Sequence, residues 1–226
     1  MADLKDTRRG GFYFDGPIPY LSVTNILSII DKPALRYWFG REVYRAMLKD
    51  PTLDEKTALA APYAVSDVAK NRGRTVDDIT QMLEESAVAP EYQLYADAYR
   101  QFLKDSPTKL IEQQHSIFDK ENKVAGTLDK YWEIGGKLHV TDVKTGKDIY
   151  DEVRLQLSAY AHMLRLEGKT VDSISVLLLE VGDDKKPTGK YKFQTLEEDF
   201  PAFLAAKTLY EWTNKEKLLK LGYLQP

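Results

Sequence analysis

The sequence predicts a mixed α/β domain that follows a helical N-terminal region. Up to residue 107, apolar residues recur mostly at helical spacing. Between residues 108 and 181, four runs rich in β-branched and aromatic residues indicate strands. One stretch with helical spacing, residues 151–167, separates the third run from the fourth. This order is typical of a sheet that is covered by helices.

The N-terminal region is expected to consist of several separate helices. Apolar residues recur at helical spacing over residues 33–49, and Pro33 suits the first turn of that helix. A short helix is expected from Asp54 to Ala61, and Pro62 should end it because proline disrupts a helix interior. Similar patterns predict further helices at 63–71, 75–86 and 90–104.

Three consecutive strands are expected to follow, at 109–118, 124–134 and 137–144. Gly135 and Gly136 separate the second strand from the third and predict a tight hairpin turn. The helix that begins at Asp151 should stop near Gly168, a residue that commonly ends helices. The remaining elements are expected to be strands 173–181 and 190–195 and a mostly helical segment, 196–221.

The composition excludes several classes of site and location. The chain contains no cysteine, which excludes disulfides, zinc–thiolate sites and iron–sulfur clusters and fits a reducing compartment. The first ten residues are charged and provide no secretory apolar segment. No apolar run approaches the roughly 20 residues that a membrane span needs. We therefore expect a cytoplasmic protein without a membrane partner.

The formal net charge of −3 differs from that of a strongly basic nucleic-acid-binding protein. It does not exclude binding to nucleic acid, because only a local groove must attract phosphate. No glycine-rich phosphate loop is present, so no ATP site is expected.

Two carboxylates and a lysine are expected on adjacent strands. Asp142 and Lys144 are two residues apart and should project to the same side of their strand. The predicted hairpin places the strand that holds Asp129 beside the strand that holds Asp142. Carboxylate oxygens are ligands that Mg²⁺ and Mn²⁺ prefer, and a lysine can contact a phosphate. The set therefore suits metal-assisted hydrolysis of a phosphodiester.

The helix that follows carries Gln156 and Tyr160 one turn apart on one face. Tyr160 also continues an apolar stripe, so its ring is expected in the core whatever its hydroxyl group does. An Asp-x-Lys triplet alone is common by chance, and Asp129 could simply be a strand-end residue. The order and spacing of the whole set favour the catalytic interpretation, with a glycine three residues before Asp129 and Thr-Gly directly after Lys144.

This combination resembles the RecB-like branch of the PD-(D/E)xK nuclease superfamily. The usual pattern of the branch is Gly-x-x-Asp, then Asp-x-Lys, then Gln-x-x-x-Tyr. The matching pairs in this chain are Gly126/Asp129, Asp142/Lys144 and Gln156/Tyr160. Residues 142–160 also resemble phage-encoded members and the mitochondrial genome maintenance exonuclease type, as do residues 20–27 and 32–38. The resemblance covers most of the chain.

The resemblance implies a restriction-endonuclease-like fold, with a mixed central sheet and an αβββαβ core. It implies that Mg²⁺ or Mn²⁺ is bound by Asp129, Asp142 and the carbonyl of Val143. It implies that Lys144 positions the attacking water or stabilises charge at the phosphate. In the same way, Gln156 and Tyr160 are implied to shape the site and to contact the DNA backbone.

The family often places a metal-binding histidine on an upstream helix, four residues after a glycine. In this chain Asp77 stands four residues after Gly73, and a carboxylate suits Mg²⁺ or Mn²⁺ better than imidazole does. Alternatively, Thr75 and Asp78 form a capping box, and Asp77 then only favours the start of a helix there. Both interpretations of Asp77 stay open at this point.

Basic residues recur at helical spacing over residues 32–49, with aromatic residues between them. This arrangement suits single-stranded nucleic acid, whose phosphates contact the charges and whose bases stack on the rings. The alternative is a solvated helix face whose aromatic residues belong to the core, and we favour it for Trp38 and Phe39. Arg36 and Arg41 are retained as DNA-binding candidates together with Tyr160.

These observations predict a Mg²⁺- or Mn²⁺-dependent DNA exonuclease that acts on single-stranded or frayed ends, of phage or bacterial origin. Residues 1–107 are expected to contribute to the DNA cleft, and residues 108–226 to form the nuclease core with a C-terminal helix. Phage or host replication and recombination proteins are possible partners. Two alternatives stay open: a structure-specific endonuclease, and a non-catalytic DNA-binding or assembly subunit that retains the fold.

Overall fold

The computed structural model describes residues 11–82, 88–183 and 185–225. The described residues fall into two compact units. The larger unit comprises those within Met1–Ile30 and Ala89–Pro226, and the smaller unit those within Asp31–Val88. This division does not coincide with the boundary that we expected after residue 107.

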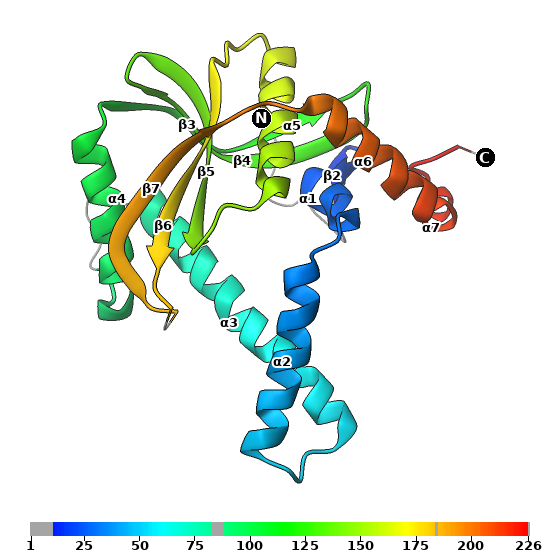
Figure 1. The fold of residues 1–226 in the computed structure, drawn as a ribbon. Coiled ribbons are helices and arrows are strands. Elements are labelled where there is room, and N and C mark those ends of the chain that lie inside the picture. The colour runs from blue at the N-terminus through cyan, green and yellow to red at the C-terminus, as the bar shows by residue number, and fades with distance from the viewer. Residues whose placement is uncertain (1–10, 83–87, 184, 226) are drawn as a thin grey trace. The chain divides into compact units, whose positions relative to one another are not determined.

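A mixed sheet of seven strands forms the centre of the larger unit (Figure 1). Its strands are β1 (Phe12–Asp15), β2 (Ile18–Ser22), β3 (Thr108–Asp119), β4 (Val124–Ile134), β5 (Lys137–Gly146), β6 (Ser173–Val181) and β7 (Pro187–Leu196). The order is β1-β2-β4-β5-β6-β7, and β3 pairs with β4 off this path. The pairs β2–β4 and β5–β6 are parallel, and the other pairs are antiparallel. The predicted α/β class with a mixed central sheet is confirmed.

The helices of the larger unit alternate with its strands in the order that was predicted for the core. They are α1 (Val23–Ile26), α4 (Gln93–Asp105), α5 (Asp151–Leu166), α6 (Phe200–Thr213) and α7 (Lys215–Lys220), with the 3-10 turns η2 (Leu27–Ile29) and η3 (Pro90–Tyr92). The succession α4, β3, β4, β5, α5, β6 is the expected αβββαβ order.

Helices α4 and α5 cover opposite faces of the sheet (Figure 1). On one face, Phe102 of α4 packs on the rings of Tyr191 and Phe193 from β7, with centroids 5.4 and 5.3 Å apart. On the other face, Gln156 of α5 donates a hydrogen bond to Asp142 of β5. Because neighbouring residues of a strand alternate between faces, the even-numbered residues of β7 lie on the α5 face, opposite to Tyr191 and Phe193.

The edge of β4 changes partner along its length. Leu21 and Ser22 of β2 pair with Val124 and Ala125 at its start, and β5 pairs with residues 130–134 at its end. In the described part of the sheet, these two registers leave residues 126–129 without a strand partner on that edge. The Gly-x-x-Asp segment therefore lies where β2 and β5 diverge.

The two N-terminal strands were not expected from the sequence. β1 and β2 form an antiparallel hairpin, and Tyr13 and Tyr20 of this hairpin are buried against Ala125 of β4. Phe118 of β3 packs edge-on against both tyrosine rings. The beginning of the chain is thus part of the central sheet and not a separate helical region.

The smaller unit consists of two helices, α2 (Pro33–Lys49) and α3 (Glu55–Gln81). The predicted bounds of α2 are confirmed, with Pro33 in its first turn. The expected break at Pro62 is wrong, because α3 continues through this buried proline and through Gly73. The ring of Phe39 packs on Trp38 and Tyr63 with centroids 5.1 and 5.2 Å apart, which joins the two helices. The expected helix end at Ser86 lies outside the described residues.

Within the described part of the chain, none of the helices combines the length and the apolar character that crossing a membrane requires.

Candidate active site

Asp129 is held by the backbone of the neighbouring strand. The amide N–H of Val143 donates a hydrogen bond of 3.0 Å to Asp129 Oδ2. This contact is geometrically possible because residues 126–129 have no ladder partner on the edge that faces β5. It places the carboxylate of Asp129 next to the residue that follows Asp142 in sequence. The structure thus brings the two predicted carboxylates together.

Asp142 is 2% exposed and is surrounded by donors. Lys144 Nζ lies 2.9 Å from Asp142 Oδ1 and 2.7 Å from Asp142 Oδ2. Gln156 Nε2 donates to Asp142 Oδ1 at 3.2 Å. The Oδ2 atom accepts no well-directed hydrogen bond from the described residues, so its short contact with Lys144 is best treated as an ion pair. The Lys144 side chain is 43% exposed and can reach solvent or a ligand.

Tyr160 lies in the core, as its apolar stripe predicts, and is 3% exposed. Its hydroxyl oxygen accepts a hydrogen bond from Gln156 Nε2 at 3.4 Å. Burial, followed by the nearby Tyr13, Asp129 and Asp142, raises the pKa of Tyr160 well above its usual value. The hydroxyl group therefore stays protonated and neutral beside the two carboxylates.

The donor set fits a hard divalent cation. Asp129 and Asp142 supply carboxylate oxygens, and Asp142 Oδ2 is a buried anionic atom that forms an ion pair with Lys144. Among the described residues, no group of three or more acidic or histidine side chains could enclose a metal. This is compatible with Mg²⁺, which keeps several waters and is commonly bound by one or two carboxylates and substrate phosphates.

The smaller unit contains the other three predicted site residues. Asp77 is half-buried on α3, and Arg36 and Arg41 are exposed on α2. Arg36 forms an ion pair with Asp31, and Arg41 Nε lies 3.9 Å from Glu42 Oε1. The participation of these residues in the site stays a prediction.

The capping-box alternative for Asp77 is wrong, because no helix begins there. α3 runs from Glu55 to Gln81 without a break, and the hydroxyl of Thr75 donates to the carbonyl of Asn71 one turn earlier. Asp77 is therefore an interior helix residue and cannot be explained as a charge at a helix N-terminus.

A group of hydroxyl side chains around Thr127 was not predicted from the sequence. The hydroxyl of Thr127 lies 3.1 Å from that of Tyr13 on β1 and 3.1 Å from that of Ser116 on β3. Thr127 stands between Gly126 and Asp129, so this group connects the first segment of the site to two further strands. The aromatic run Phe12–Phe14, which lies between Gly11 and Gly16, was the available signal for β1.

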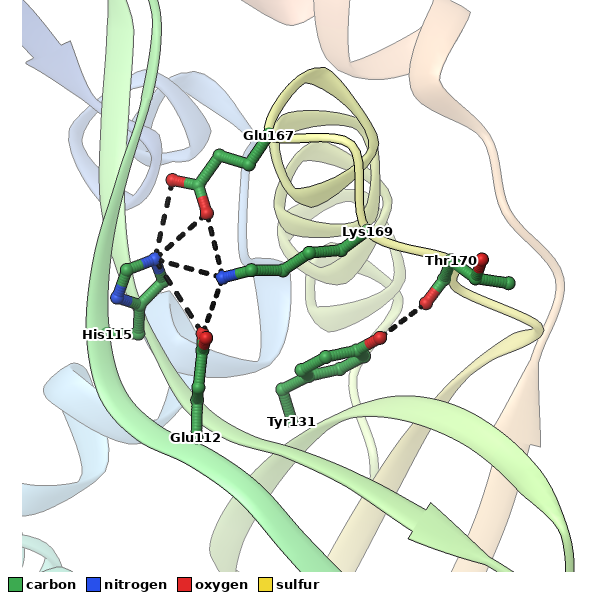
Figure 2. A network of polar contacts seen from close by, with 6 residues as sticks. All are labelled: Glu112, His115, Tyr131, Glu167, Lys169 and Thr170. Atoms are coloured by element: carbon green, nitrogen blue, oxygen red, sulfur yellow. Dashed lines mark hydrogen bonds and ion pairs between the residues drawn. The ribbon is translucent and has the colours of Figure 1, made fainter.

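A second polar network anchors the C-terminal end of α5 to strands β3 and β4 (Figure 2). Lys169 Nζ donates to Glu112 Oε2 at 2.6 Å and to Glu167 Oε2 at 2.9 Å. His115 Nε2 lies 3.0 Å from Glu167 Oε2. The hydroxyl of Tyr131 donates to the carbonyl of Thr170 at 2.6 Å. Since α5 carries Gln156 and Tyr160, this network helps to fix the helix that completes the site.

This chain is similar in structure to several solved proteins, but its sequence identity to them is low. No family model matches the chain, and no match is found among curated proteins. An alkaline exonuclease, LHK-Exo, from Laribacter hongkongensis is 11% identical, with a TM-score of 0.47 and 91% of each chain covered. The complex of LHK-Exo with dAMP aligns at 9% identity with a TM-score of 0.32, covering 88% of this chain and 93% of that chain. With TM-scores below 0.5, these likenesses do not assign a family or a function to this chain.

Proposed function

We propose that this protein is a Mg²⁺- or Mn²⁺-dependent deoxyribonuclease of the RecB-like PD-(D/E)xK type that removes nucleotides from DNA ends. The observation that carries the proposal is the arrangement of two side chains and one backbone amide around two carboxylates. Asp129 accepts from the Val143 amide, and Asp142 contacts both Lys144 and Gln156. Binding alone requires no such pair of carboxylates beside a lysine, which disfavours a non-catalytic subunit.

Each side chain has a role that follows from its chemistry. Asp129, Asp142 and the Val143 carbonyl would hold the cation. A bound Mg²⁺ or Mn²⁺ supplies a Lewis acid that offsets charge on the phosphate and activates water. Lys144, whose side chain is 43% exposed and contacts Asp142, would orient a water molecule or stabilise charge on the phosphate.

Gln156 and Tyr160 support this arrangement from the helix side. Gln156 Nε2 donates to both Asp142 Oδ1 and the Tyr160 hydroxyl, so it orients the carboxylate relative to the helix. The neutral hydroxyl of Tyr160 can contact a phosphate oxygen without electrostatic repulsion, because burial keeps its pKa high. Both residues would thereby position the DNA backbone.

The preference for single-stranded or frayed ends is also part of the proposal. This preference is proposed because the sequence resembles exonucleases and because α2 carries basic residues, including Arg36 and Arg41. Asp77 is proposed as a further ligand, directly or through water. Phage or host replication proteins are the proposed partners of the enzyme.

One assay tests the function directly. Linear and covalently closed DNA, each single- and double-stranded, are incubated with the protein and Mg²⁺, Mn²⁺ or EDTA. We expect mononucleotides or short products from linear DNA, only with a divalent cation. Cutting of closed circles as fast as linear strands would support the endonuclease alternative. Binding without any hydrolysis would support the non-catalytic alternative.

A further inference from the structure

A groove of about 420 Å³ lies beside the candidate active site in the larger unit. It is lined by the loop that joins β5 to α5, the first turn of α5 and the second half of β7. Its volume falls within the range of about 300–1,000 Å³ that is usual for ligand sites. None of the roles proposed above uses the residues of this groove.

The strand register connects the groove to Lys144. Lys144 of β5 pairs with Leu178 of β6, and Leu178 pairs with Lys192 of β7. Residues that pair across neighbouring strands share a face, so Lys144 and Lys192 lie in one row on the face that α5 partly covers. Two strand spacings separate their Cα atoms by about 10 Å. Leu178, which lies between the two lysines in this row, is buried in the core, so the row fixes their spacing but is itself covered.

Two cationic side chains of the groove are available to an anionic ligand. Lys192 is exposed, and no carboxylate of the described residues lies within ion-pair distance of it. Arg154 lies 4.0 Å from Asp199 and is 41% exposed, and its Nε atom is buried without a hydrogen-bond partner among the described residues. Both side chains line the groove. A lysine and an arginine that line one groove suit a phosphate better than an isolated surface lysine does.

Acidic residues also line the groove, namely Asp148, Asp151 and Glu197. Among the described residues they belong to no cluster that could hold a metal ion. Asp151 lies in the first turn of α5, where a negative charge stabilises the helix. These charges oppose an anion, so a ligand needs a second source of binding energy besides the two cations.

Tyr150 provides such a source. It precedes α5, makes no capping hydrogen bond with its side chain, lines the groove and is 61% exposed. An exposed aromatic ring beside cations is the usual combination for binding single-stranded nucleic acid, because every base can stack on it. Tyr150 stands in the loop that joins β5, which carries Lys144, to α5, which carries Gln156.

We infer that this groove binds the nucleotide adjacent to the cleaved bond, with its base stacked on Tyr150 and its phosphate at Lys192 and Arg154. The inference rests on the proposed nuclease function and adds a subsite that holds one unpaired nucleotide. Stacking does not discriminate between bases, so the subsite accepts any sequence but requires an unpaired base.

Fluorescence anisotropy with a short fluorescein-labelled oligothymidylate tests the inference. Ca²⁺ replaces Mg²⁺, because it binds the same oxygen ligands, and the intact length of the probe is verified after the measurement. We expect Tyr150→Ala to weaken binding at least about fivefold, the lower limit for one stacked base, and Tyr150→Trp to restore it. Trp212→Ala, which removes an exposed ring from α6, is the matched control and should bind like the wild type.

Abasic probes separate stacking from a structural effect. In a series of probes with one abasic residue at successive positions, the wild type should lose affinity at one position. Tyr150→Ala should lose this dependence on position. Lys192→Gln should reduce the slope of log affinity against log salt by about one, because one phosphate contact is lost. Lys137→Gln, on the other end of β5, should leave the slope unchanged.

The outcomes distinguish this inference from the nuclease proposal. If the wild type binds the probe through Tyr150 but hydrolyses no DNA with Mg²⁺ or Mn²⁺, the subsite stands and the proposed activity fails. If the wild type hydrolyses DNA while Tyr150→Ala and Lys192→Gln bind the probe as tightly as the wild type, the subsite is wrong and the activity stands. Absence of probe binding by the wild type also overturns the inference.

Discussion

A β-carbon placed on Gly126 would lie only 2.4 Å from Cε1 of Tyr160. The first residue of the Gly-x-x-Asp segment is therefore packed directly against the last residue of the Gln-x-x-x-Tyr segment. The glycine is needed here for close approach and not for its backbone angles, since its φ is not positive. The absence of a side chain at Gly126 allows α5 to pack closely on the part of β4 where β2 and β5 diverge.

We expect Gly126→Ala to destabilise the protein by about 1–3 kcal/mol, because the buried Tyr160 ring has little room to move. We also expect lower nuclease activity, since a displacement of 1 Å at an active site can cost about 10²-fold in rate. Chemical denaturation measures the first effect and DNA degradation the second.

Gly40→Ala is the matched control for this prediction. Gly40 lies inside α2, and nothing would contact a β-carbon there within 4 Å. Alanine has a higher helix propensity than glycine, so this variant should be more stable than the wild type by up to about 1 kcal/mol. Equal stability of Gly126→Ala and the wild type would contradict the packing argument.

Lys144→Ala and Asp142→Ala should each lower the rate of DNA degradation at least about 10²-fold, the scale of one strong transition-state contact. The degradation should require Mg²⁺ or Mn²⁺ and stop with EDTA. Circular dichroism should show an intact fold for Lys144→Ala, since this side chain is 43% exposed. Lys137→Ala, at the exposed end of the same strand, serves as the control. A wild-type rate in either folded variant would refute the site assignment.

Most of the larger unit could be predicted from local sequence patterns. Strands β3, β4 and β5 follow their predicted bounds within two residues, and the turn at Gly135 and Gly136 forms as expected. Both glycines have positive φ angles, which explains why this dipeptide gives a reliable hairpin signal. Strand β6 was likewise predicted from its continuous apolar run, and helix α5 from the helical spacing of its apolar residues.

The features that were missed depend on contacts between distant residues. β2 pairs in parallel with β4 through only Leu21 and Ser22, and no local pattern of the sequence reveals this pairing. Pro62 was expected to end a helix, but it is buried within α3. Packing of α2 on α3, as at Phe39 and Tyr63, offsets the cost of about 3 kcal/mol that a proline brings to a helix interior.

The sequence indicated which candidate residues of the larger unit lie together but not their geometry, and the participation of Asp77, Arg36 and Arg41 stays a prediction. The spacing indicated that Asp142 and Lys144 share a face, and they form an ion pair. That Asp129 accepts a hydrogen bond from the Val143 amide depends on the gap in pairing along β4. The position of β2 sets this gap at residues 126–129 of β4, and β2 was not predicted from the sequence.

Asp77→Ala should raise the concentration of Mg²⁺ or Mn²⁺ needed for half-maximal activity at least several-fold, if its carboxylate supports the cation directly or through water. Asp78→Ala removes the neighbouring exposed carboxylate of the same helix and is the control. Metal titrations of DNA degradation measure both. Equal metal dependence of Asp77→Ala and the wild type would exclude this residue from the site.

Linear single-stranded DNA should be degraded while a closed circle of the same sequence survives, because an exonuclease needs a free end. Arg36→Ala and Arg41→Ala should weaken binding of the linear strand, and the loss should shrink as salt increases, because phosphate contacts release counterions. Arg100→Ala, which removes a partly exposed arginine from α4, should have no effect. Unchanged binding by both α2 variants would remove this helix from the proposed DNA path.

The network at the end of α5 predicts how stability depends on pH. Burial raises the pKa of Glu167, but hydrogen bonds from Lys169 and His115 outweigh it, and the pKa is lowered from its usual 4.5. Burial lowers the pKa of Lys169, but hydrogen bonds to Glu112 and Glu167 outweigh it, and the pKa is raised from 10.5. The contribution of Glu167 to stability is thus complete above pH 4.5 and is lost as the pH falls through its lowered pKa. The contribution of Lys169 is complete below pH 10.5 and is lost as the pH rises through its raised pKa.

Glu167→Gln should therefore lower the free energy of unfolding by up to about 1 kcal/mol between roughly pH 5 and pH 10, since the pair is partly exposed. Below this range the variant and the wild type should converge, because protonated Glu167 has lost its negative charge. Denaturant unfolding at a series of pH values measures the difference. Glu121→Gln, which changes an exposed carboxylate in the turn before β4, should show no such dependence. A difference for Glu167→Gln that persists unchanged into strong acid would mean that packing, and not charge, joins α5 to β3.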